Sequence, residues 1–105
     1  MTYKLSFRIR KIYFVQIVAG TKTIEVRAQK PFWILRVGRA VQQLLWGNPV
    51  ICTFVCGKEI HRRYLDRIEY YETAAGALGR PPSEQGLKDI GEGPVFGFHL
   101  GEVVS

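Results

Sequence analysis

The run of residues 20–27 constrains the fold more than any other part of the chain, because it combines a helix stop, a turn and a strand. Its sequence is Gly-Thr-Lys-Thr-Ile-Glu-Val-Arg. Gly20 tolerates the left-handed backbone conformation that ends many helices. The β-branched residues that follow favour an extended strand. The run therefore predicts a helix that ends at Gly20, a tight turn, and a strand over residues 23–28.

The charged side chains of this run gather on one side of the predicted strand. Successive side chains in a strand point to opposite faces, so Ile24 and Val26 share one face. Glu25 and Arg27 share the other face, and Lys22 stands at the start of the strand. We expect the apolar pair to face the core and the charged side chains to face solvent.

Hydrophobic patterning predicts the elements of the first half of the chain. Period-two alternation over residues 4–9 predicts a strand with one buried face. Apolar residues at helical spacing predict a short helix over residues 11–19. Residues 33–37 have the character of a loop with an aromatic anchor at Trp33. Residues 39–46 alternate imperfectly and fit either a strand or a helix, and we favour a strand.

The second half of the chain predicts two strands and two helices. Gly-Asn-Pro at residues 47–49 marks a turn before a long strand over residues 50–61. Apolar residues at three- and four-residue intervals predict an amphipathic helix over residues 64–78. Ser83 is placed to cap a short helix that continues to residue 90. Residues 94–104 have too much apolar content for an exposed edge strand, so we expect a strand paired on both sides.

Composition bounds the class of protein. A chain of 105 residues suits one compact domain over residues 1–105, and 47% hydrophobic with 23% charged residues is far from the profile of disorder. The formal charge of +6 permits nucleic-acid binding and equally fits scattered solubilising charge. Without a secretory segment or an apolar run of about 20 residues, we expect a cytoplasmic protein with no membrane contact.

The two cysteines predict neither a disulfide nor a metal site. Cys52 and Cys56 are four residues apart on one predicted strand, which separates them by about 13 Å. We expect free thiols in a reducing compartment. Together with His61 and His99, the cysteines show no spacing typical of metal ligands. We therefore predict no metal and no other cofactor.

The motif Gly20-x-Lys22-x-x-Glu25-x-Arg27, placed after a short helix, resembles the signature of the ASCH domains. These domains are small β-barrels similar to the PUA family of RNA-binding modules. The predicted order of elements is similar to the ASCH layout over nearly the whole chain, although the family often has Gly-Asp where this chain has Gly38-Arg39. The resemblance implies an α+β fold, a PUA-like mixed β-barrel with short flanking helices, that binds RNA or a nucleotide-like ligand.

In this interpretation Lys22 and Arg27 contact phosphate, while Glu25 orients Arg27 or accepts a hydrogen bond from a base. The simpler alternative is an exposed Glu-Arg pair worth less than about 1 kcal/mol. Two further basic clusters extend the predicted RNA-binding surface from neighbouring elements. They are Arg8, Arg10 and Lys11 beside the first strand, and Arg62 with Arg63 between the long strand and the predicted helix.

Two other classes of function remain open. An enzyme acting on RNA or a modified nucleoside would use Lys22 and Glu25 as its catalytic pair. A nuclease would add a divalent ion held by Glu25 and a second acid such as Glu69 or Asp66. A branch of the family hydrolyses acetylcytidine with a threonine nucleophile, whose position is occupied here by Glu25. A protein-binding module would use apolar surface around Trp33. We expect Trp46 in the core, where large aromatic residues of small domains usually lie.

Overall fold

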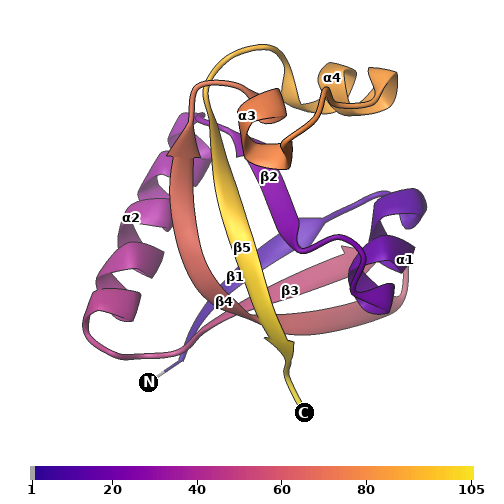
Figure 1. Cartoon of the computed structure of the whole chain (residues 1–105). Helices are drawn as coiled ribbons and strands as arrows, with labels where there is room; N and C mark the ends of the chain where they lie inside the picture. Colours follow the sequence, from indigo (N-terminus) through magenta and orange to yellow (C-terminus); the bar gives the residue numbers. More distant parts are fainter. Residues whose placement is uncertain (1) are drawn as a thin grey trace.

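The computed structural model describes residues 2–105 (Figure 1). Within these residues the chain forms five strands and four helices. In chain order they are β1 (Tyr3–Arg8), α1 (Lys11–Ala19), β2 (Ile24–Ala28), α2 (Pro31–Leu45), β3 (Val50–Cys56), β4 (Glu59–Tyr71), α3 (Ala74–Leu78), α4 (Glu84–Ile90) and β5 (Val95–Val103).

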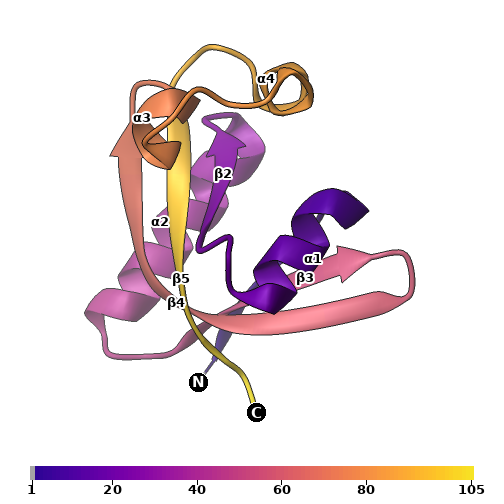
Figure 2. The same ribbon diagram turned by 45° about the vertical axis from the view of Figure 1, so that its right-hand side comes forward.

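The strands form one curled sheet, a half-barrel, so the fold is of the α+β class. The strand order is β1-β3-β4-β5-β2, in which only the β1–β3 pair is parallel. Strands β1 and β2 are therefore the two edges of the sheet. In Figures 1 and 2, α3 and α4 lie together at one end of the half-barrel, whereas α2 lies along its side. The open side between the two edge strands is where the candidate site lies.

The main core fills the concave side of the sheet. The ring of Phe7 stacks on Trp33 and Phe54, at centroid distances of 4.9 and 5.1 Å, and meets Phe98 edge-on at 5.0 Å. Trp33 belongs to α2, so these aromatic contacts fix that helix against the strands. These rings, together with buried aliphatic side chains of β1, β3 and α2, form one continuous cluster.

A second, smaller core lies on the other face of β2 and β5. Val26 and Val95 pack there against Ala74 and Ala77 of the short helix α3. Strand β2 therefore has buried side chains on both of its faces, which is unusual for an edge strand that shows an alternating pattern.

Several local predictions are confirmed. The strand over residues 4–9, the helix over 11–19 and the strand over 23–28 correspond to β1, α1 and β2. Gly20 has φ 82°, in the left-handed region, and its N–H donates to the Ile17 carbonyl at the end of α1. Ser83 caps α4 by accepting a hydrogen bond from the Gly86 N–H at 3.0 Å. Strand β5 pairs with both β4 and β2, so it is not an edge.

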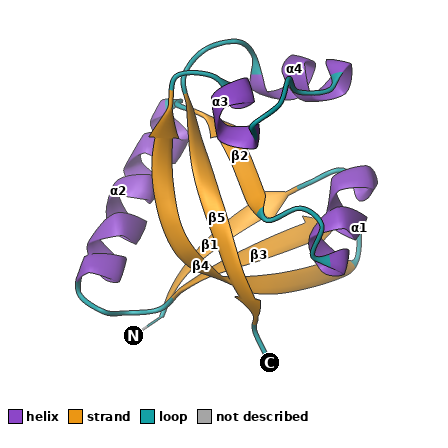
Figure 3. Ribbon diagram, in the orientation of Figure 1, coloured by secondary structure: helices purple, strands orange, loops and turns teal. Residues whose placement is uncertain are grey.

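The predicted loop at 33–37 and the predicted strand at 39–46 are wrong, because both segments belong to the single helix α2 (Figure 3). Trp33, Val37 and Ala40 recur at helical spacing and are the buried residues of this helix. The outward side of α2 is also rich in apolar residues, which hid this periodicity in the sequence. Trp46, expected in the core, is 64% exposed just beyond the helix.

The predicted strand at 50–61 is extended as expected but is interrupted by a turn, whereas the predicted helix at 64–78 is wrong except at its end, where α3 lies. The chain turns after β3, with Gly57 at φ 61°, and β4 then runs through most of the predicted helix (Figure 3). The pairing of β4 with β5 shifts register near Leu65, which marks a bulge. A bulge inserts one residue, so Leu65 and Ile68 reach the same core although they are three residues apart. This spacing imitates that of a helix.

No helix among residues 2–105 is both long enough and apolar enough to cross a membrane.

Candidate functional site

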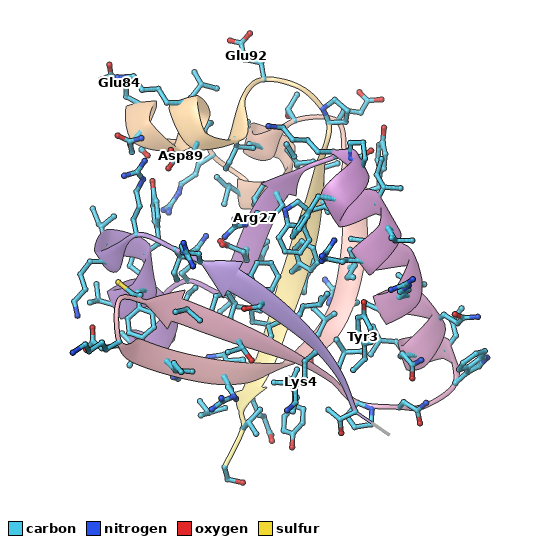
Figure 4. The ribbon with its side chains drawn as sticks, turned by 180° about the vertical axis from the view of Figure 1, so that it is seen from behind. Tyr3, Lys4, Arg27, Glu84, Asp89 and Glu92 are labelled. Atoms are coloured by element: carbon cyan, nitrogen blue, oxygen red, sulfur yellow. The ribbon has the colours of Figure 1, made fainter. Side chains whose placement is uncertain are left out.

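A cavity of about 1110 Å³ lies at the open side of the half-barrel. It is bounded by the end of β1, by α1 and β2, and by the segment that contains α4. In Figure 4, Arg27 lies on β2 below α4, the helix that carries Asp89. Five cationic residues and two carboxylates line the cavity, which gives it an excess of positive charge. These residues are Arg8, Arg10, Lys22, Arg27 and Arg80, with Glu25 and Asp89.

The three charged residues of the motif form one ionic cluster around the buried Glu25 carboxylate. The Glu25 carboxylate is the centre of it: Oε2 accepts a hydrogen bond from Arg27 Nη2 at 2.8 Å, and Oε1 lies 3.4 Å from Lys22 Nζ. The Glu25 side chain is only 8% exposed. Lys22 Nζ also donates to the Ile24 carbonyl at 2.7 Å. The carboxylate therefore holds an ammonium and a guanidinium in fixed positions at the base of the cavity.

Arg27 bridges the gap between the two edge strands. Its Nη2 lies 3.3 Å from the carbonyl oxygen of Arg8, to which it donates a hydrogen bond from β2 to β1. The guanidinium carbon lies 5.2 Å from the ring centre of Phe7 and 5.6 Å from that of Trp33. These contacts with aromatic faces and with a backbone carbonyl keep the guanidinium at the seam of the half-barrel.

The prediction that the charged face of β2 points to solvent is wrong. In the β2–β5 ladder Glu25 pairs with Phe98, and paired residues project to the same face of a sheet. Phe98 is fully buried in the main core, so Glu25 and Arg27 point into the half-barrel. Val26, on the opposite face, packs beneath α3. Alternation correctly separated the two faces, but it could not show that both are covered.

Two contacts tie α4 to α1 across the cavity. Arg10, which precedes α1, donates two hydrogen bonds to Asp89, at 2.8 and 2.9 Å. These bonds hold the pKa of the Asp89 carboxyl below its usual value, and the positive charge of Arg27 acts in the same direction. The Tyr13 hydroxyl lies 3.2 Å from Ser83 Oγ. Helix α4 therefore forms one wall of the cavity and is held there by polar contacts.

The remaining predicted binding residues do not join this cavity. Lys11 forms an ion pair with Glu59, and both side chains are exposed. Arg62 is exposed on β4, in the middle of a strand rather than at the predicted strand–helix junction. Arg63 donates hydrogen bonds to the carbonyls of Ile17 and Gly101, both at 3.0 Å, and so ties α1 to the sheet. Of the two additional basic clusters, only Arg8 and Arg10 line the cavity.

Tyr13, Arg80, Ser83 and Asp89 are among the polar residues of the cavity wall that the sequence did not predict as site residues. Residues 10 and 89 are 79 positions apart in the chain. No local pattern marks such a pair, because their proximity depends on how the last helices fold back over the sheet.

Neither the cysteines nor the histidines line the cavity. Burial raises the pKa of the Cys52 thiol to about 12, and the nearby charge of Glu25 adds to the increase. Cys52 therefore stays protonated at neutral pH. Cys56 is a second free thiol, partly buried at the end of β3. In the part of the chain that the structure describes, no group of three or more His, Cys, Asp or Glu side chains is placed to hold a metal ion.

No protein-family model, curated protein or solved structure matches the chain. What the cavity binds therefore has to be inferred from its own side chains. These side chains offer fixed N–H donors from a guanidinium and an ammonium, beside polar and apolar walls. Such donors suit an anionic ligand, above all one with phosphate oxygens.

Proposed function

We propose that this chain is an ASCH-like, PUA-like domain that binds RNA or a nucleotide-like ligand in the cavity between β1 and β2. The observation that supports this proposal best is the pair of cations, Lys22 and Arg27, held at the base of the cavity by the buried Glu25. Donors that are already fixed lose little conformational entropy when a ligand binds. The cavity, at about 1110 Å³, is large enough for a nucleotide.

Each residue of the motif that resembles the ASCH signature has a structural role in the fold. Gly20 ends α1, so that the chain can turn directly into β2. Lys22, Glu25 and Arg27 then converge in one cluster instead of lying separately along a strand. A curled sheet with helices around it is the kind of scaffold that the resemblance implies. The convergence supports a shared role for the three residues.

The contacts favour an orienting role for Glu25. Both of its carboxylate oxygens already have a cationic neighbour, Arg27 at 2.8 Å and Lys22 at 3.4 Å. A base amino group would have to displace Lys22 before it could reach the carboxylate. We therefore infer that Glu25 positions Arg27 and Lys22, while their remaining N–H groups, with those of Arg10 at the cavity wall, contact phosphate.

An enzyme acting on a modified nucleoside is the second candidate function. The observation that favours it is the Lys22–Glu25 pair, which combines an amine and a carboxylate in a cavity. Thr23 lines the same cavity and is the hydroxyl nearest to this pair in sequence. If this function is correct, incubation with RNA or modified nucleosides yields a product in mass spectrometry, and the product disappears in the Lys22→Met variant.

Binding is tested with fluorescence anisotropy, using labelled single-stranded, duplex and transfer RNA. The test variant is Lys22→Met, which removes the charge but keeps an apolar stem and leaves Glu25 paired with Arg27. Its matched control is Lys58→Met, because Lys58 is an exposed cation in the β3–β4 turn, outside the cavity. Loss of a charge-assisted hydrogen bond predicts about tenfold weaker binding for Lys22→Met or more. We expect less than about a twofold change for the control.

The salt dependence of the same titration shows whether Lys22 contacts a phosphate group of the RNA. For single-stranded RNA, removal of one phosphate contact lowers the slope of log K against log salt by about 0.7. Equal weakening by Lys22→Met and Lys58→Met would place the RNA elsewhere on the basic surface. If no RNA binds, direct titration of a labelled mononucleotide distinguishes a small ligand from an incorrect proposal: a mononucleotide that also fails to bind refutes it.

A further inference from the structure

Helix α2 has a second face that the fold does not use. Its inner face packs into the main core through Trp33, Val37 and Ala40. On the outward side Phe32 and Leu35 are 55% and 56% exposed, and their spacing of three residues makes them neighbours on the helix surface. Helix α2 contributes none of the described residues that line the cavity. This exposed surface is therefore separate from the proposed ligand site.

The exposed side chains form one continuous stripe along the helix. Phe32, Leu35, Arg39, Gln42 and Trp46 are all exposed and follow one another at intervals of three and four residues. This spacing places them on one side of a helix, as in the seam of two packed helices. We call these five residues the outer stripe of α2, counting Trp46, the residue that caps the end of the helix. Its two ends are apolar and its middle is polar.

All charged residues of α2, on the outer stripe and beside it, are cationic. The chain has no Asp or Glu between residues 26 and 58, a region that includes all of α2. Arg36, beside the stripe, lies 3.5 Å from the centre of the Phe32 ring and donates to the Phe32 carbonyl. None of the ion pairs found among residues 2–105 includes Arg36 or Arg39. Both guanidinium groups are available to carboxylates from another molecule.

Gly38 provides a second, independent observation. It lies inside α2, where glycine weakens a helix relative to alanine. A Cβ atom added at Gly38 would meet nothing within 4 Å, so no packing contact within this chain requires glycine. Gly38 lies on the exposed side of α2, three residues after Leu35 and four before Gln42 of the outer stripe, so it borders the stripe on the helix surface. A missing side chain there allows the backbone of another helix to come close.

We propose that the outer stripe of α2 docks an acidic amphipathic helix of a partner protein. Leucine-like side chains of the partner would cover Phe32, Leu35 and Trp46, and its flanking carboxylates would pair with Arg36 and Arg39. The partner helix would pass over Gly38.

Other occupants fit the surface less well. In a symmetric dimer of this chain, the cations of one α2 would face those of the other. A bilayer would have to accept Arg39 and Gln42 in the centre of the inserted face, whereas a protein can pair each of them. RNA gains little from exposed aliphatic side chains such as Leu35, because stacking on bases needs aromatic or guanidinium groups. Charge complementarity therefore favours an acidic helix.

The test uses a labelled synthetic helical peptide with leucines at three- and four-residue spacing and glutamates beside them. A second peptide has lysines in place of the glutamates. We expect wild type to bind the glutamate peptide at least tenfold more tightly than the lysine peptide. Gly38→Leu fills the open space without a clash in the free chain, so it should raise the melting midpoint and weaken peptide binding at least tenfold. Lys58→Glu is the charge control and should change binding less than twofold.

Several outcomes would overturn the proposal. If the two peptides bind equally, pairing of carboxylates with Arg36 and Arg39 does not contribute to binding. If Gly38→Leu binds the glutamate peptide as wild type does, the peptide does not dock on the outer stripe. Self-association of wild type that Gly38→Leu abolishes in sedimentation would assign the stripe to a dimer. Binding to anionic phospholipid vesicles without peptide binding would assign it to a membrane. RNA binding by Gly38→Leu should equal that of wild type, so failure here is distinguishable from failure of the proposed function.

Discussion

Replacement of Arg27 by methionine tests whether the ionic cluster around Glu25 has the energetics that its geometry implies. The substitution removes the guanidinium but keeps an unbranched apolar stem beside Phe7 and Trp33. It also removes the 2.8 Å hydrogen bond to Glu25 and the link to the Arg8 carbonyl. We expect Arg27→Met to fold and to be clearly less stable than wild type.

The magnitude follows from what remains around Glu25. Removal of one member of a buried ion pair usually costs about 3–5 kcal/mol, because the other charge is left uncompensated. Here Lys22 Nζ stays 3.4 Å from the carboxylate, and the Arg27 side chain is already 26% exposed. We therefore expect the free energy of unfolding to fall by about 2–3 kcal/mol. Lys22→Met, which leaves the shorter Arg27 contact intact, should cost about 1 kcal/mol.

Urea unfolding followed by circular dichroism measures these changes, and a double-mutant cycle isolates the pair. Once Glu25→Gln has removed the carboxylate charge, Arg27→Met should cost at least about 1 kcal/mol less than it does in wild type. The reasoning is refuted if Arg27→Met costs less than about 0.5 kcal/mol, or if the effects of the two substitutions add within that margin.

Three further predictions concern other parts of the molecule. Gly97→Ala should cost about 1–3 kcal/mol in urea unfolding, because the added Cβ would lie 2.6 Å from Tyr71 Cε2. Burial lowers the pKa of His99 below its ordinary value of 6.5, so the unfolded chain binds this proton more tightly. Stability should therefore fall as the pH drops through about 6.5 and level off below the folded pKa, which thermal melts between pH 7 and pH 5 measure. Iodoacetamide at pH 8 should label Cys56 and spare Cys52, whose pKa burial raises to about 12, as read by intact mass.

Each of these predictions has its own control. Gly101→Ala should cost less than Gly97→Ala, since its added Cβ approaches the end of the exposed Asp66 side chain, which can move. The pKa of His61 is also lowered by burial, so both histidines contribute to the pH dependence. The double variant His61→Gln/His99→Gln should lose most of the slope between pH 7 and pH 5, and a persistent slope would contradict the assignment. For the cysteines the control is unfolding: in urea, where burial is lost, Cys52 and Cys56 should react equally with iodoacetamide.

Local chemistry in the sequence was enough to predict the elements at the two ends of the chain. Alternation over residues 4–9 identified β1, and the glycine stop at Gly20 placed the boundary between α1 and β2. Ser83 identified the start of α4. These signals depend on backbone geometry within a few residues, which is why they needed no knowledge of the rest of the fold.

The elements in the middle of the chain were predicted wrongly because their apolar residues follow patterns that fit more than one type of secondary structure. Helix α2 combines a buried face with an exposed apolar face, so Trp33 and Phe32 look alike in sequence although only Trp33 is in the core. In β4, the bulge near Leu65 gives core residues a spacing of three, which is also typical of a helix. Only contacts with other elements separate these alternatives.

The candidate site shows the same division between local and tertiary information. The sequence by itself determined that Lys22, Glu25 and Arg27 stand close together, and that Glu25 and Arg27 share one face of a strand. Tertiary structure decided which face points inward, because pairing with β5 turns Glu25 toward Phe98 and into the half-barrel. It also decided that Asp89 closes the cavity from a distant helix. Alternation along a strand predicts which side chains share a face, but the segments that cover each face lie far away in the chain.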